Sequence, residues 1–197
     1  MEPVILASNS FQRQEYLKLL GLPFSIMPSL ENEELAESLP PEDAAREFAL
    51  RKVKAVIKLL QGNSLPWIIG ADTLISLEGN IYGKPKDRED ARRMLAMFRG
   101  RDHEVITGMA LFNCREKKID CRSVVSTVNF SPLRDSEIEW YLDTGEWQGV
   151  AGAYRIQGLA ACFITSIRGS FSSIVGLPLR ELYVMLKDNG YLYGDTP

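Results

Sequence analysis

The stretch VILASNSFQRQEYL, residues 4–17, joins a predicted strand directly to a predicted helix through a run of polar residues. Residues 4–7 form an apolar run suited to a buried strand, and Leu17, Leu19 and Leu20 have the spacing of a helix face. A strand that leads straight into a helix is typical of α/β proteins. The first N–H groups of such a helix have no partner within it, so the joint is also a place where anions bind.

The polar residues of this joint permit two interpretations. Ser8 and Ser10 offer hydroxyl donors to an anion, and Arg13 adds a guanidinium group one turn into the helix. Alternatively, Ser8 or Ser10 caps the helix and Arg13 is solvated. The phosphate-loop motifs GxxxxGK[ST] and GxGxxG are absent here, so the joint alone does not identify a nucleotide site.

The rest of the chain alternates between strand and helix patterns. The strongest helix pattern is residues 41–60, with Pro41 in its first turn. Its predicted buried stripe is Ala45, Phe48, Ala49, Val53, Val56, Ile57 and Leu60. Further predicted strands are residues 23–29 and 67–77, the second broken at Gly70, and a strand that follows a tight turn within 78–82. Residues 103–114 and 123–132 are two more predicted strands, joined by a turn at 115–118. A hairpin is predicted within 159–176, with its turn at Arg168 and Gly169. Further predicted helices are 87–98, capped by Asp87, then 135–145 and 177–190, with a loop at 145–158. The predicted class is therefore α/β, with a mixed central sheet flanked by helices.

Composition narrows the function classes. The chain has 197 residues, a length that predicts one domain or two small lobes sharing a core. With 23 basic and 26 acidic residues the net charge is −3, so duplex nucleic acid is not an expected partner. No apolar run has the length of a membrane span, and the start lacks the pattern of a signal peptide. Three cysteines without a CxxC pair favour reduced thiols, so we expect a cytoplasmic protein with no membrane partner.

The single histidine, His103, excludes several kinds of site. Zinc sites need several His or Cys ligands at short spacing, and a Ser-His-Asp triad would have to include this one residue. Its place at the entry to a predicted strand favours a structural role. Chemistry in this chain must therefore rest on carboxylates, lysines and arginines.

Four residues stand out as candidates for such chemistry. Asp72 lies within an apolar strand, where a carboxylate must be hydrogen-bonded, paired or metal-bound, unless it caps a turn. Lys52 lies inside the strongest helix, and the alternative is that its tip reaches water. Pro85 holds the backbone of Lys84 in an extended conformation. Glu33 belongs to an acidic cluster, and the alternative is that this cluster is simply a solvated loop. Carboxylates that bind hard divalent ions, together with lysines that offset phosphate charge, suit metal-assisted chemistry on a polyphosphate.

Six motifs in order resemble those of the Maf family, described as nucleoside triphosphate pyrophosphatases and once linked to inhibition of septum formation. The motifs are LASNSFQR, GADT, GKP, GRDHEVITG, AGAYRIQG and GSFSSIVGLP. The resemblance runs from Ile5 to about Leu182 and implies a single Maf-like domain over residues 1–197. It also implies an α/β fold with two lobes around a cleft, similar to the inosine triphosphate pyrophosphatases.

The resemblance assigns roles to residues at matching positions. Asp72 is implied as the proton acceptor for the attacking water and, with Glu33, as a ligand of Mg²⁺ or Mn²⁺. The implied phosphate-binding groups are Ser8, Ser10, Arg13, Lys52 and Lys84, and the positions tied to choice of base are Gln12, Thr73 and Gln157.

The chain departs from the family pattern in three places. Gln12 replaces the first arginine of the usual Ser-Pro-Arg-Arg, which bears on the choice of base. Gly149 and Val150 replace the usual Asp-Lys before Ala-Gly-Ala-Tyr. Arg155 stands where glycine is usual, and it would restore a cation near the lost lysine.

The predicted substrate is a nucleoside triphosphate, hydrolysed to monophosphate and pyrophosphate. AGAYRIQG resembles the branch that acts on dTTP and UTP, and the Gln157 amide matches the N3–H and carbonyl groups of uracil and thymine. Modified pyrimidine nucleotides fit the same prediction. The alternatives are a nucleotide-binding regulator of cell division without significant turnover and, less favoured, a generic phosphatase.

The resemblance also bears on assembly, because the family is often dimeric. Trp140, Tyr141 and Trp147 provide more aromatic surface than a short helix and loop require, which favours a homodimer. Packing of these rings against the protein's own core is the alternative.

Overall fold

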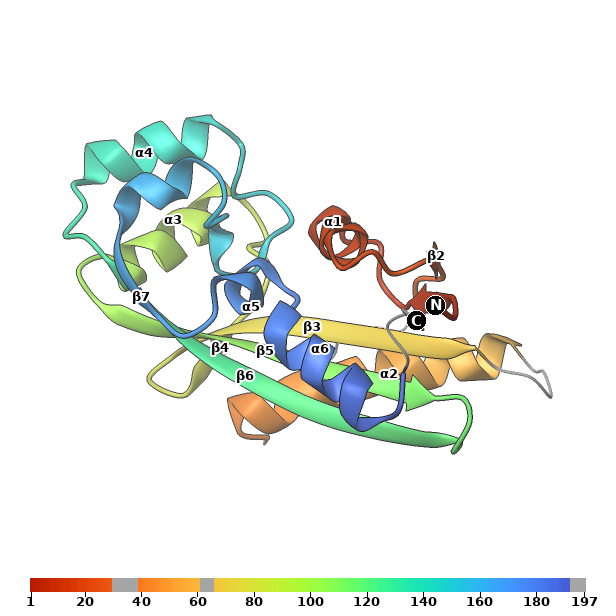
Figure 1. The fold of residues 1–197 in the computed structure, drawn as a ribbon. Helices are drawn as coiled ribbons and strands as arrows, with labels where there is room; N and C mark the ends of the chain where they lie inside the picture. Colours follow the sequence, from red (N-terminus) through yellow and green to blue (C-terminus); the bar gives the residue numbers. More distant parts are fainter. Residues whose placement is uncertain (30–38, 61–65, 192–197) are drawn as a thin grey trace. The chain divides into compact units, whose positions relative to one another are not determined.

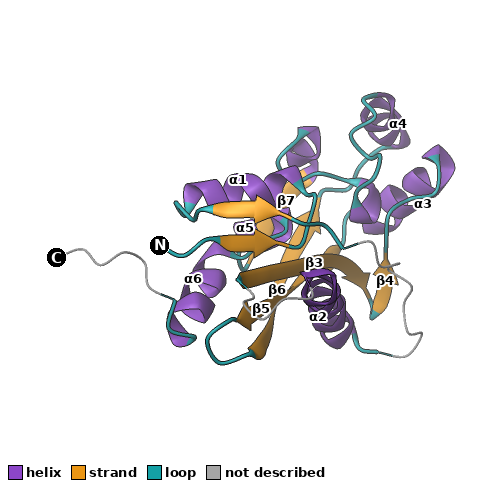
Figure 2. Ribbon diagram, turned by 90° about the vertical axis from the view of Figure 1, so that its right-hand side faces the viewer, coloured by secondary structure: helices purple, strands orange, loops and turns teal. Residues whose placement is uncertain are grey.

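The structure, a computed structural model, describes residues 1–29, 39–60 and 66–191. Within these ranges seven strands form one mixed sheet in the order β2-β1-β3-β5-β6-β7, with β4 paired to β3 (Figures 1 and 2). The strands are β1 (Val4–Leu6), β2 (Phe24–Ile26), β3 (Trp67–Leu77), β4 (Asn80–Tyr82), β5 (Asp102–Asn113), β6 (Lys118–Phe130) and β7 (Ile164–Arg168). The helices are α1 (Phe11–Leu19), α2 (Pro41–Leu60), α3 (Arg88–Phe98), α4 (Asp135–Asp143), α5 (Phe171–Val175) and α6 (Leu179–Asp188), with short 3-10 turns η1 (Ala151–Ala153) and η2 (Leu159–Phe163). The predicted α/β class with a mixed sheet is confirmed.

The chain divides into two compact units that are each built from several segments. The first unit comprises residues 1–72, 107–124 and 176–197, and the second comprises 73–106 and 125–175. Strands β3, β5 and β6 therefore contribute residues to both units.

The first unit has apolar side chains on both faces of its strands. β1 runs parallel to β2 and to β3, with Val4 opposite Trp67 in the latter pair. Because side chains alternate along a strand, one set of strand residues packs with α1 and α6 and the other with α2. Figure 1 shows α2 and α6 on opposite faces of β3 and β5.

Two glycines let α2 lie directly on the strands of the first unit. A Cβ atom added to Gly70 on β3 would lie 2.6 Å from the carbonyl oxygen of Ala49, and one added to Gly108 on β5 would lie 2.1 Å from that of Ala45. The predicted break of the strand at Gly70 is wrong, since β3 continues through it. The missing side chain serves close packing of the helix instead.

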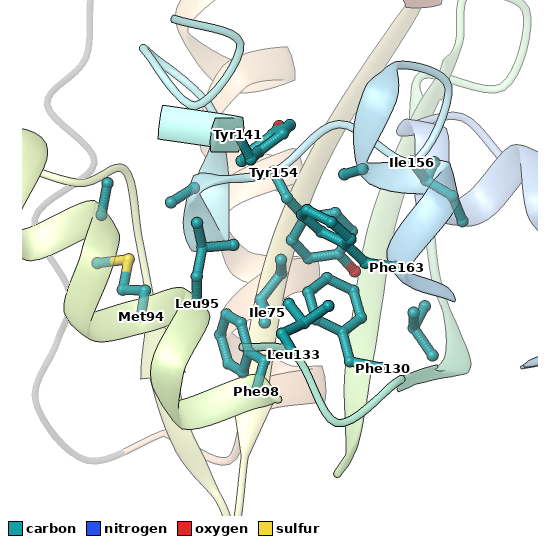
Figure 3. Packing of buried hydrophobic residues seen from close by; sticks show 14 of the residues in the cluster. Ile75, Met94, Leu95, Phe98, Phe130, Leu133, Tyr141, Tyr154, Ile156 and Phe163 are labelled. Atoms are coloured by element: carbon teal, nitrogen blue, oxygen red, sulfur yellow. The ribbon is translucent and has the colours of Figure 1, made fainter. Parts of the chain in front are cut away.

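The second unit has its own core around an aromatic cluster. Phe98 on α3, Phe130 on β6 and Tyr154 pack edge to face, with Phe130 and Tyr154 ring centroids 4.9 Å apart (Figure 3). The predicted cap of α3 is confirmed, because Asp87 Oδ1 accepts from the backbone N–H of Asp90 at 2.8 Å. Ile75 from β3 completes the centre of this cluster.

The predicted hairpin across Arg168 and Gly169 is wrong. Residues 164–168 form β7, which pairs with β6, but residues 171–175 form the short helix α5. The serines explain the difference, because Ser170 Oγ accepts from the N–H of Ser173 and starts a helical turn. The pairing of the strands before and after the turn at 115–118 is confirmed, although β6 begins at Lys118 rather than at 123.

Candidate active site

The polar joint between β1 and α1 holds a buried arginine. Arg13 is 8% exposed, and its Nε donates to the carbonyl oxygen of Gly176 at 2.8 Å. A terminal N–H of the same guanidinium donates to Ser8 Oγ at 3.0 Å, and the N–H of Ser10 donates to that hydroxyl at 3.2 Å. The prediction that Arg13 is simply solvated is therefore wrong, since the protein fixes this cation at the start of a helix.

Ser10 occupies the N-cap position of α1, but its side chain does not cap the helix. Its hydroxyl donates to Gln12 Oε1 at 3.3 Å, and no helix N–H donates to it among the described residues. Ser8, Ser10, Gln12 and Arg13 thus form one group connected by hydrogen bonds. The first turn of α1 supplies backbone N–H groups beside them.

Lys52 on α2 forms an ion pair with Asp72 on β3. Lys52 Nζ contacts Asp72 Oδ1, and the two side chains are 14% and 9% exposed. The contact follows from the strand pattern, because Asp72 lies two residues from Gly70 and so points to the same face, toward α2. The alternatives of a solvated Lys52 tip and a turn-capping Asp72 are both wrong.

The joint follows β1, which pairs with β3, the strand that carries Asp72. The N–H of Ala7, at the end of β1, donates to the carbonyl oxygen of Ile69 on β3 at 2.8 Å. The chain therefore leaves β1 for the joint close to the point where β3 reaches Asp72. Three charged groups, two cationic and one anionic, lie in this part of the unit and are almost entirely withdrawn from water.

Thr73 and Glu33 are two further residues that the sequence predicts for the site. Thr73 follows Asp72 on β3, so its side chain points to the opposite face of the strand. Glu33 lies outside the described residues. Gly176, whose carbonyl fixes Arg13, was not predicted; its only signal in the sequence was its place in the motif GSFSSIVGLP.

The remaining predicted residues, Lys84 and Gln157, lie on two joined loops of the second unit. Both side chains are exposed. The N–H of Gly152 donates to the carbonyl oxygen of Gly83 at 3.0 Å, which ties the loop of Gln157 to the loop of Lys84. Gly152 has a φ of 65°, and an added Cβ would lie 2.3 Å from Ile75 Cδ1. Only glycine therefore fits at the point where the two loops meet.

His103 is a structural residue of the second unit, as its sequence position favours. Its Nε2 lies 2.8 Å from the hydroxyl of Tyr154, and its ring stacks on Phe98 with centroids 4.5 Å apart. Burial lowers the pKa of His103 to about 4, while the nearby charge of Asp102 opposes this effect. The ring is therefore neutral at pH 7.

The three aromatic residues singled out for assembly differ in exposure. Tyr141 is fully buried in the core of the second unit, and Trp147 is half-buried and donates from Nε1 to the carbonyl oxygen of Leu142 at 2.9 Å. Only Trp140 is exposed, at 48%. Core packing thus accounts for two of the three rings.

Two surveys of the described residues bear on the class of protein. In residues 1–29, 39–60 and 66–191, no helix combines the length and apolar character needed to cross a membrane. In the same part of the chain, no three His, Cys, Asp or Glu side chains gather so as to hold a metal ion. The three cysteines, Cys114, Cys121 and Cys162, are free thiols.

Comparison with known proteins gives matches over nearly the whole chain. Residues 3–189 match the family described as Maf-like protein. A protein named dTTP/UTP pyrophosphatase from Pelotomaculum thermopropionicum is 42% identical over 191 residues, covering 97% of this chain and 98% of that protein. One of the same name from Symbiobacterium thermophilum is 40% identical over 191 residues, covering 97% and 96% respectively. Among solved structures, the Staphylococcus aureus Ham1 protein aligns with 66% of this chain and 73% of its own at 15% identity, with a TM-score of 0.45.

Proposed function

Because this chain belongs to the Maf family, we propose that it hydrolyses nucleoside triphosphates, dTTP and UTP foremost, to the nucleoside monophosphate and pyrophosphate. The observation that carries the proposal is the nearly buried ion pair of Lys52 and Asp72, in the same compact unit as the fixed Arg13. A carboxylate can accept the proton of water that attacks a phosphoric anhydride, and cations held largely away from water can stabilise the charge that develops. The relatives named dTTP/UTP pyrophosphatase supply the expected substrates.

Asp72 is proposed as the group that accepts the proton of the attacking water. The water oxygen forms a bond to the α-phosphorus. At the same time the bond between the α-phosphorus and the oxygen that bridges it to the β-phosphate breaks, and pyrophosphate leaves. The Lys52 ammonium has three N–H donors, so it can orient the carboxylate through Oδ1 and also contact a phosphate oxygen. The bonds from Arg13 to Gly176 and Ser8 hold its guanidinium in place, and its charge is proposed to offset that of the phosphates.

A divalent cation, Mg²⁺ or Mn²⁺, is part of the proposal. Magnesium is commonly bound by one or two carboxylates together with substrate phosphates, and the Asp72 carboxylate is a hard oxygen donor of this kind. Glu33 is the second proposed ligand. Such an ion would polarise phosphate oxygens and offset their charge.

The proposed contacts to the rest of the substrate follow from the family match. Lys84 is proposed to contact phosphate oxygens, with Ser8 and Ser10 as hydroxyl donors. Gln157, Gln12 and Thr73 are proposed to influence the choice of base. The exposed Gln157 amide offers both a donor and an acceptor, as the edge of uracil or thymine requires.

The experiment that tests the proposal identifies the direct product. Purified protein is incubated with dTTP and Mg²⁺ or Mn²⁺, and pyrophosphate and orthophosphate are assayed separately. We expect pyrophosphate and dTMP in equal amounts. Orthophosphate as the only direct product would indicate a phosphatase, and tight nucleotide binding without turnover would indicate a regulator of cell division.

A homodimer remains part of the proposal. Trp140 is the exposed aromatic side chain of its segment, and its ring packs edge to face on Phe163 with centroids 6.1 Å apart. A ring held in this way presents a rigid apolar surface. A monomeric mass in solution at micromolar concentration would exclude the dimer.

A further inference from the structure

The loop of Gln157 contains a turn that is closed by its own backbone. The N–H of Gly158 donates to the carbonyl oxygen of Arg155 at 3.0 Å, so residues 155–158 form a four-residue turn. Ile156 points into the core of the second unit (Figure 3), whereas Gln157 is exposed at the tip. The direction of the Gln157 side chain therefore depends on what holds the two ends of this turn.

Arg155 holds the first end. Its Nε donates to the carbonyl oxygen of Glu146 at 3.1 Å, and a terminal N–H donates to that of Gln148 at 3.3 Å. Its own backbone N–H donates to the hydroxyl of Tyr141 at 3.2 Å. A planar guanidinium that bridges two carbonyl oxygens fixes one loop against the other.

Glu146 holds the second end. Its Oε2 accepts from the backbone N–H of Leu159 at 2.9 Å. The carboxylate also fills the space beside Gly158, where an added Cβ would lie 2.2 Å from Oε2. The side chain of Arg155 thus bonds the backbone of Glu146, and the side chain of Glu146 bonds the backbone just beyond the turn.

We infer that Arg155 and Glu146 form a reciprocal clamp that positions Gln157 and so sets the selectivity for the nucleobase. The inference rests on the proposed function, in which Gln157 contacts the base. The uracil edge presents an N3–H donor, whereas the cytosine edge presents an N3 acceptor, so the orientation of the Gln157 amide decides which of the two it matches. Arg155 and Glu146 are positioning residues and act on the substrate only through Gln157.

The test compares discrimination between dTTP and dCTP in matched variants. Arg155→Ala removes the two guanidinium bonds and Glu146→Ala removes the carboxylate bond, while Arg155→Lys keeps a donor and Glu146→Gln keeps an acceptor oxygen. Arg99→Ala is the control, because Arg99 pairs with Asp135 on the surface of the same unit. For each protein we would measure kcat/KM for both nucleotides and the Kd of their non-hydrolysable α,β-imido analogues.

Both Ala variants are expected to lower the dTTP-to-dCTP ratio by about three- to tenfold, the effect of losing one orienting hydrogen bond. The conservative variants should retain most of the ratio, and Arg99→Ala should leave it unchanged. An unchanged ratio in the Ala variants, an equal loss for both nucleotides, or a parent without preference would overturn the inference. A parent that releases no pyrophosphate would instead refute the proposed function, and the Kd ratios would still decide the clamp.

Discussion

At the scale of single residues, Asp72 distinguishes an enzyme from a nucleotide-binding protein. Asp72→Asn keeps the size of the side chain and removes the proton acceptor, so we expect kcat to fall by about 100-fold or more while nucleotide still binds. Pyrophosphate release and the Kd of a non-hydrolysable analogue measure the two effects. Asp135→Asn, which alters an exposed carboxylate of α4, is the control. Turnover close to that of the parent would contradict the assignment of Asp72 as base.

His103 predicts a loss of stability in acid. Its pKa is about 4 in the folded protein and about 6.5 when unfolded, so below pH 6.5 the unfolded chain binds a proton that the folded one does not. The free energy of unfolding should therefore fall with decreasing pH, by about 2 kcal/mol between pH 8 and pH 5. Urea titrations at these two pH values measure it.

A variant isolates this contribution, because His103 is the only histidine of the chain. In His103→Gln the difference between pH 8 and pH 5 should largely disappear, even if the variant is less stable at both. An unchanged difference would mean that other groups cause the loss.

The sequence singled out several residues that make buried polar contacts in the structure, but it did not predict those contacts. Asp72 and Lys52 were each conspicuous, one as a carboxylate in an apolar strand and the other as a lysine in a helix. Their pairing depends on how α2 crosses β3, which no local pattern encodes. Arg13 is a similar case, since its partner Gly176 lies 163 residues away.

At the scale of elements, the crossing of α2 over β3 predicts a coupling between packing and activity. Gly70→Ala places a Cβ against the Ala49 carbonyl and 2.8 Å from Val53 Cγ2, so α2 must move away. We expect the free energy of unfolding to fall by about 1–3 kcal/mol, as in overpacked cores. Turnover should fall as well, because Lys52 moves with α2.

The control for this prediction is Gly83→Ala, since nothing lies within 4 Å of a Cβ at that position. Its stability should equal that of the parent in the same chemical denaturation experiment. A Gly70→Ala protein with parental stability and turnover would show that α2 adjusts without disturbing Lys52.

Elements with strong local signals were predicted well, and those that depend on distant partners were not. The cap at Asp87 and the apolar stripe of α3 lie within one short segment, so the sequence alone specifies them. The 3-10 turn η2 depends instead on Glu146, and the start of α5 combines the local bond to Ser170 Oγ with a bond from the Ser170 N–H to the distant Ser126. Residues 159–176 are rich in β-branched and small residues, and β-branched residues favour strands, so the sequence alone predicted a hairpin in this segment.

At the scale of the whole molecule, substrate preference is the property to measure. We expect kcat/KM for dTTP and UTP to exceed that for GTP and 7-methyl-GTP, because a neutral amide at position 157 suits a neutral pyrimidine edge. Gln157→Glu should reduce this preference. A tenfold preference of the parent for 7-methyl-GTP, equivalent to about 1.4 kcal/mol, would contradict the assignment.

The division of the chain into segments has a consequence for its synthesis on the ribosome. The first unit contains β1, yet its core includes Leu182 and Met185 of α6, which follow the whole of the second unit in the chain. A nascent chain that ends at residue 175 carries all of the second unit but leaves the α6-facing side of β1 and β3 uncovered. We expect protease to cleave such ribosome-bound chains within residues 1–72 while the second unit resists; equal resistance of both would argue against this order. Residues 1–72 precede the whole of the second unit in the chain, yet their core would be completed only after that unit has formed.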